Sequence, residues 1–165
     1  MVVAGEVWGT DGMSSIRLIV AFSALLALAG CNTAGVDSIE TTAMPRPVSQ
    51  AQADLRAGRA QFEDGNYGLA EKHYRKAVEL RADSAEGWMG LAASYDQLGR
   101  FDLADRAYGE LVKIAGRQPR IVNNMGYSQY LRGNKAQARK LYAEARAGMT
   151  NTAIVDANLK LLDKG

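Results

Sequence analysis

Side chains that could act as nucleophiles, general bases or metal ligands are few in this chain. Among 165 residues it has one cysteine, Cys31, and one histidine, His73. A single cysteine cannot form an internal disulfide, and these two residues do not make a zinc or iron centre. No serine lies in a nucleophile elbow, and no glycine-rich loop of the phosphate-binding type is present. We therefore predict that the protein is not an enzyme and carries no metal or cofactor.

The charge balance excludes a further class of function. The chain has 20 Lys and Arg against 18 Asp and Glu, which leaves a net charge of +2. Nucleic-acid binding usually needs a concentrated basic patch, so this balance does not favour it. The mean hydropathy of −0.20 indicates neither a disordered chain nor one that crosses a membrane many times. We therefore expect neither a nucleic-acid partner nor a small-molecule substrate.

The lone cysteine follows a segment typical of a secretory signal. No charged residue occurs between Arg17 and Cys31, and residues 18–28 are almost wholly apolar. This run is shorter than the roughly 20 residues that span a bilayer. Its end, Leu28-Ala29-Gly30-Cys31, resembles the bacterial lipobox, which implies cleavage before Cys31 and attachment of diacylglycerol to its thiol. The alternative is that Cys31 is a small residue in a retained anchor helix.

The rest of the leader leads to three further expectations. Residues 1–12 carry acidic side chains where a positive region is expected, so we predict that translation starts at Met13. Asn32, by resemblance to lipoprotein sorting in Gram-negative bacteria, favours an outer-membrane anchor on the periplasmic side. Residues 31–50 have no helical apolar period and contain Pro45 and Pro47, which predicts a lipidated N-terminus followed by a flexible tether.

After the tether the chain repeats itself with a period of 34 residues. Gly65, Gly99 and Gly133 share one column, and two further columns are all alanine (70, 104, 138) and all tyrosine (74, 108, 142). This predicts three units, 51–84, 85–118 and 119–152, each of two helices that meet at the glycine. We expect the small residues at 58, 92 and 126 to face the alanine column, and the tyrosines to fill the gap towards the next unit.

Local signals predict where helices begin and how the array ends. Asp83 with Glu86 resembles a capping box, and Pro119 suits a first helical turn. Residues 151–165 predict a capping helix. Its Ile154, Leu159 and Leu162 are expected to cover the open apolar end.

The repeat columns resemble the tetratricopeptide repeat. The middle unit matches its pattern at Trp88, Leu91, Ala92, Tyr95, Gly99, Phe101, Ala104 and Tyr108. The resemblance implies an all-α superhelix of three helix–turn–helix units plus the cap, with the first helices lining a groove for protein partners. It also implies these groove residues: Arg56, Arg59, Phe62, Met89, Arg120, Asn123, Asn124, Tyr127 and Tyr130, with Glu86, Asp96 and Gln97 in the same columns. The alternative for the arginines is a solvated helical face. The family's clamp for a C-terminal carboxylate is not expected, because Arg59 and Gly90 replace two of its asparagines.

The opening of the third unit, residues 123–134, is similar to that of TadD-type lipoproteins of the tight-adherence (Flp) pilus machinery. That resemblance implies an adaptor that assists assembly or localisation of an outer-membrane secretin. Other envelope roles stay open, namely a pilotin of type IV pili, or an accessory of outer-membrane protein insertion or cell-wall synthesis. A soluble cytoplasmic scaffold is the alternative if the leader is not processed.

Overall fold

The computed structural model describes residues 47–163. The predicted signal peptide, the start at Met13, the lipidation at Cys31 and residues 31–46 of the tether lie outside the described residues. Within the described part, no helix is long and apolar enough to cross a membrane. Residues 47–163 also contain no group of three or more His, Cys, Asp or Glu side chains arranged to hold a metal ion.

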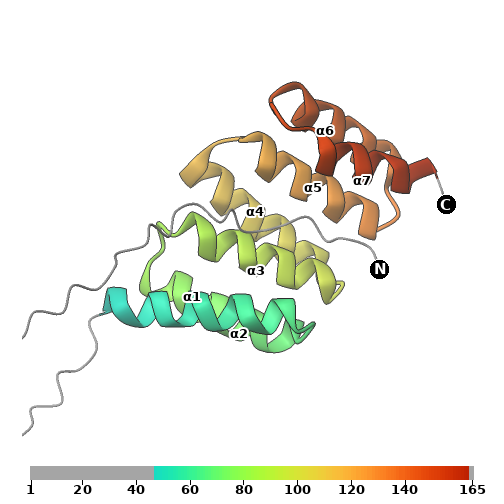
Figure 1. The fold of residues 1–165 in the computed structure, drawn as a ribbon. Coiled ribbons are helices and arrows are strands. Elements are labelled where there is room, and N and C mark those ends of the chain that lie inside the picture. The colour runs from blue at the N-terminus through green and yellow to red at the C-terminus, as the bar shows by residue number, and fades with distance from the viewer. Residues whose placement is uncertain (1–46, 164–165) are drawn as a thin grey trace, which may run out of the picture. The chain divides into compact units, whose positions relative to one another are not determined.

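The described residues form helices and turns without a strand, which confirms the predicted all-α solenoid (Figure 1). Each predicted unit holds two helices that pack against each other. The helices are α1 Pro47–Glu63, α2 Tyr67–Leu80, α3 Ala85–Gln97, α4 Phe101–Ala115, α5 Pro119–Leu131, α6 Lys135–Ala147 and α7 Ala153–Asp163.

Glycine closes the hairpin in every unit, as the sequence predicts. Gly65, Gly99 and Gly133 have φ values of 77°, 67° and 80°, which glycine adopts without steric cost. The residue after each glycine donates its backbone N–H to the carbonyl five positions earlier, at 2.8 Å in all three turns. This is the hydrogen bond of a Schellman motif. Three turns with one geometry give three units of one shape, so their apolar faces can stack.

The tyrosine column forms the centre of the packing, and Tyr74 reaches the next unit as predicted, but the predicted facing of the small residues and the alanine column is not what lies nearest to Gly58 and Gly126. Tyr74 and Tyr142 are 1% and 0% exposed. A Cβ atom added at Gly58 would lie 3.0 Å from the Tyr74 ring, and one at Gly126 would lie 2.8 Å from the Tyr142 ring. The atoms nearest these glycines therefore belong to the tyrosines, not to the alanine column. Tyr74 also reaches the next unit, because a Cβ at Gly90 would lie 2.3 Å from it.

Helix starts agree with the sequence only in part. Pro119 occupies the first turn of α5, as predicted. Helix α1 begins at Pro47, so the tether prediction is wrong for residues 47–50, which form the first turn of the helix, and the first unit begins four residues earlier than predicted. The capping box predicted at Asp83 is wrong, because Ser84 is the N-cap of α3 and its Oγ accepts a hydrogen bond of 3.1 Å from the backbone N–H of Gly87. The Glu86 carboxylate accepts a hydrogen bond from Arg59 instead.

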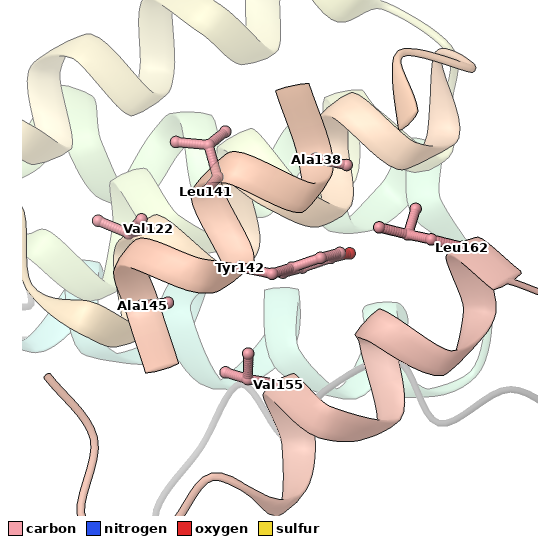
Figure 2. Packing of buried hydrophobic residues seen from close by; sticks show 7 residues of the cluster. All are labelled: Val122, Ala138, Leu141, Tyr142, Ala145, Val155 and Leu162. Atoms are coloured by element: carbon pink, nitrogen blue, oxygen red, sulfur yellow. The ribbon is translucent and has the colours of Figure 1, made fainter. Parts of the chain in front are cut away.

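Helix α7 covers the apolar end of the third unit. Figure 2 shows Val155 and Leu162 of α7 facing the Tyr142 ring of α6. Val155 is fully buried and Leu162 is 4% exposed, whereas Ile154 is 39% exposed. Leu159 packs against the same cluster. The prediction was therefore correct for Leu159 and Leu162 and wrong for Ile154, because the helix turns its neighbour Val155 inward.

Candidate binding surface on the first helices

The first helix of each unit contacts the first helix of the next. Helix α1 contacts α3, α3 contacts α5, and α5 contacts α7, whereas α2, α4 and α6 share no contacts with one another within the described residues. In Figure 1 the α1, α3, α5 and α7 ribbons succeed one another on the side nearer the viewer. We call the surface formed by these four helices the inner face.

A repeated side-chain hydrogen bond stacks the first helices. The Asn124 Nδ2 donates to the Met89 Sδ at 3.0 Å, and the Asn158 Nδ2 donates to the Asn123 Oδ1 at 3.0 Å. The partners are 35 residues apart in both cases, so α7 lies on α5 as α5 lies on α3. Met89 and Asn123 are 7% and 4% exposed. Both residues were predicted to line the groove; the structure places them between helices, below the exposed lining.

Three arginines lie on the first helices of the units. Arg56 and Arg120 are exposed on α1 and α5. Arg59 reaches across to α3, where its Nη2 lies 2.5 Å from the Glu86 Oε1. Both side chains of this pair are about one-third exposed, at 36% and 32%. The pair therefore joins units 1 and 2 at the surface.

Four aromatic rings form two pairs, one between the end of α1 and the start of α2 and one on α5. The Tyr127 and Tyr130 rings are 5.9 Å apart, and the Phe62 and Tyr67 rings meet edge to face at 5.2 Å. All four are partly buried. Tyr127 also lies close to Gln97 of the preceding unit, and burial raises the pKa of its phenol. Partly buried aromatic pairs of this kind offer rigid apolar area to a partner side chain.

The cap extends the inner face beyond the predicted groove residues. Ile154 and Leu161 lie 34 residues after Arg120 and Tyr127, in the same columns. Ile154 is exposed and Leu161 is partly buried, so the end of the inner face on α7 is apolar. The signal that would have found them is the period of 34, continued past residue 152.

Ion pairs connect each second helix to the unit that follows, and sequence reasoning missed them. Glu71 pairs with Arg100, Asp105 with Arg132, and Arg139 with Asp163, each at 2.9 Å. Residues 71, 105 and 139 share one column, and the sign of the charge is reversed in the last pair. Glu71 is only 5% exposed and also pairs with Arg75. These pairs join each second helix to the following unit and so support the assembly of the array.

The one histidine has a structural partner. The His73 Nδ1 lies 2.8 Å from the Asp54 Oδ1, which ties α2 to α1. This contact indicates that His73 contributes to the packing of α2 on α1.

The helical hairpins, their glycine turns and the stacked first helices define a solenoid of tetratricopeptide repeats. The family model of the tetratricopeptide repeat matches residues 51–84 and 85–117. The third unit has the same two helices and the same turn but lies outside the matched residues.

Two curated proteins of Pseudomonas aeruginosa are similar in sequence. The type IV pilus assembly protein PilF is 27% identical over 155 residues, which cover 88% of this chain and 61% of PilF. The cytochrome c-type biogenesis protein CycH is 34% identical over 93 residues, which cover 53% of this chain and 23% of CycH. The chain thus spans less than two thirds of the length of either relative.

Solved structures show the same fold. The structure of Pseudomonas aeruginosa PilF matches with a TM-score of 0.59 and 25% identity, covering 72% of this chain and 54% of PilF. The Yersinia enterocolitica type III secretion chaperone SycD, in complex with a peptide of the translocator YopD, matches with a TM-score of 0.58. Its identity is 19%, and the match covers 68% of this chain and 92% of SycD. Two units of the chain thus match the tetratricopeptide-repeat model, and the chain is similar in sequence and fold to part of PilF.

Proposed function

We propose that this protein is a lipid-anchored adaptor that binds a protein partner on its inner face during assembly of a bacterial pilus. The observation that carries the proposal is the similarity to PilF, which extends over 88% of the chain. The lipobox-like Leu28-Ala29-Gly30-Cys31 supports attachment of lipid at Cys31, and Asn32 supports an outer-membrane location. The partner is an outer-membrane secretin or another pilus component, of the tight-adherence machinery or of a type IV pilus.

The partner-binding part of the proposal rests on the exposed side chains of the inner face. Arg56 offers a cation at the α1 end, while Tyr127, Ile154 and Leu161 offer apolar area at the α7 end. A partner segment with a large apolar side chain would remove this area from water on binding, at about 25 cal/mol per Å².

Affinity capture from cross-linked native cells tests both parts. A tagged protein should capture secretin and pilus proteins from the membrane fraction, and Cys31→Ala should lose both the membrane fractionation and the capture. Mass spectrometry of the mature N-terminus should find a diacylglyceryl group on Cys31. Cytoplasmic partners that are unaffected by Cys31→Ala would contradict the lipoprotein proposal.

A matched pair of variants tests the inner face. Ile154 on α7 and Ile114 on α4 are 39% and 41% exposed, so their substitution by aspartate removes similar apolar surface at different places. Ile154→Asp should abolish capture of the partner and Ile114→Asp should retain it, with equal melting temperatures for the two variants. Loss of capture in Ile114→Asp alone would place the binding surface on the second helices.

A second candidate follows from the similarity to CycH, which is 34% identical over 93 residues. In that case the same capture would recover proteins of cytochrome c maturation in place of a secretin. Recovery of those proteins, with no pilus component, would replace the pilus proposal by this one.

A further inference from the structure

A buried carboxylate lies at the joint between units 2 and 3. Asp96 at the end of α3 is 4% exposed. Its Oδ2 accepts a hydrogen bond of 3.0 Å from the Tyr108 hydroxyl, and its Oδ1 accepts one of 2.6 Å from the Ser128 hydroxyl. Tyr108 belongs to unit 2 and Ser128 to unit 3, so one carboxylate joins the two units. Both donors of these two hydrogen bonds are uncharged hydroxyl groups.

Little positive charge is left over to offset an ionised Asp96. Arg132 is the nearby cation, but it makes a bidentate pair of 3.0 Å and 2.9 Å with Asp105 and donates to Ser128 rather than to Asp96. The titratable or charged groups around Asp96 are Asp105 and Tyr108 on α4, and Tyr127 and Arg132 on α5 and at its end. Burial raises the pKa values of both tyrosines, which are therefore neutral at physiological pH.

The same burial acts on the carboxyl group. It raises the pKa of Asp96 from its usual 3.8 to about 6, although the hydrogen bonds from Ser128 and Tyr108 and the charge of Arg132 act in the opposite direction. The folded protein thus binds this proton more tightly than the unfolded chain does. The resulting stabilisation is complete below the unfolded pKa and is lost as the pH rises through the folded one.

The joint is also the loosest part of the array. Helix α4 packs far less against α5 than α2 packs against α3. A cavity of about 160 Å³ lies at this joint, lined in part by Asp105, Tyr108 and Ser128, which belong to the hydrogen-bond network around Asp96. Its volume suffices for several water molecules, so protons and water can reach the network. The chain crosses the joint at Gly116, whose φ is 75°.

We propose that Asp96 is a proton-operated latch: the neutral carboxyl group holds unit 3 and α7 tightly on unit 2, and ionisation loosens them. A neutral group is compatible with a buried site that lacks a paired cation, whereas a charge there favours entry of water through the cavity. The latch is adjacent to the inner face, because the neighbouring Gln97 lies close to Tyr127 across the same joint. The inference does not depend on the identity of the partner.

Hydrogen exchange of backbone amides tests the latch in the whole protein. Protection in α5–α7, taken relative to α1–α2 of the same molecule, should fall by roughly 10- to 100-fold between about pH 4 and about pH 7.5. Asp96→Asn, which cannot ionise, should remove this pH dependence. Ser128→Ala deletes a donor that favours the ionised form, so it should move the midpoint to higher pH. Glu144→Gln breaks the exposed pair with Arg117 and should leave the pH dependence intact.

Three results would overturn the inference. They are a pH-independent ratio in the unmodified protein, an unchanged pH dependence in Asp96→Asn, and an equal loss of protection in α1–α2, which would indicate global unfolding. If Asp96→Asn does not fold, the unmodified protein and Ser128→Ala decide the matter. A midpoint that does not move in Ser128→Ala would then exclude Asp96 as the titrating group.

Discussion

The substitution Gly90→Ala should destabilise the array although alanine is the better helix former. Gly90 lies on α3 against the ring of Tyr74, and an added Cβ would lie 2.3 Å from two ring atoms and 2.6 Å from a third. Ordinary contact begins near 3.4 Å, so the ring or the helix must move by about 1 Å. Tyr74 is 1% exposed and also lies against Gly58, which leaves the ring no free side.

The expected size follows from two opposing effects. Overpacking of a core costs about 1–3 kcal/mol, and this contact is close enough to fall at the upper end. Replacing glycine by alanine within a helix returns about 1 kcal/mol. We therefore expect the free energy of unfolding to fall by about 2 kcal/mol, measured by urea denaturation at constant pH.

A matched control separates the two effects. Gly109 is an exposed glycine in the middle of α4, and an added Cβ would meet nothing within 4 Å. Gly109→Ala should therefore raise the free energy of unfolding by about 0.5–1 kcal/mol. Combining Gly90→Ala with Tyr74→Leu should cost less than the sum of the single changes, because the smaller side chain frees the space. Equal effects of the Gly90 and Gly109 substitutions would refute the close contact with Tyr74.

Two other pairs of substitutions test individual hydrogen bonds. The Tyr142 hydroxyl is buried without a hydrogen-bond partner among the described residues, so Tyr142→Phe should raise the free energy of unfolding by about 0.5–1 kcal/mol. Tyr108→Phe removes a hydrogen bond to the Asp96 carboxylate and should lower the free energy of unfolding by about 1.5–3 kcal/mol. A Tyr108→Phe variant that is more stable than the unmodified protein would contradict that hydrogen bond. Ser84→Ala should cost about 1 kcal/mol by loss of the α3 N-cap, and Asp83→Ala, at an exposed position, should stay within about 0.5 kcal/mol. Thermal or urea denaturation of each variant checks these values, and equal losses at 83 and 84 would speak against Ser84 as the cap.

The class of fold could be predicted from the sequence because the repeat carries it in local terms. A glycine that must adopt positive φ marks each turn, and a period of 34 places Tyr74 and Tyr142 at equivalent buried positions. Such features depend on the backbone of one hairpin and on the residue type in it. They hold in every unit, whatever packs outside.

The candidate binding surface was less predictable, because equivalent positions of the repeat are covered by different neighbouring helices in each unit. Asn123 was expected to line the groove. It is buried, because α7 packs on α5 and the Asn158 side chain donates a hydrogen bond to the Asn123 Oδ1. Asp96 shares a groove column as well, yet it lies under the joint between units. A column position predicts the direction of a side chain and says nothing of the neighbour that covers it.

By itself, the sequence determined the helical hairpins, their number, their turns and the tyrosines that separate them, since each depends on residue types at short range. Only the tertiary structure decided which residues of the first helices and of α7 are exposed and which are buried. Ile154 is exposed and Val155 buried because α7 approaches the Tyr142 ring with one particular side. Asp96 is held at the joint because Tyr108 and Ser128 converge on it from two units. Such positions follow from how separate helices meet, and a hydrogen bond or a burial of this kind has no signature within either helix alone.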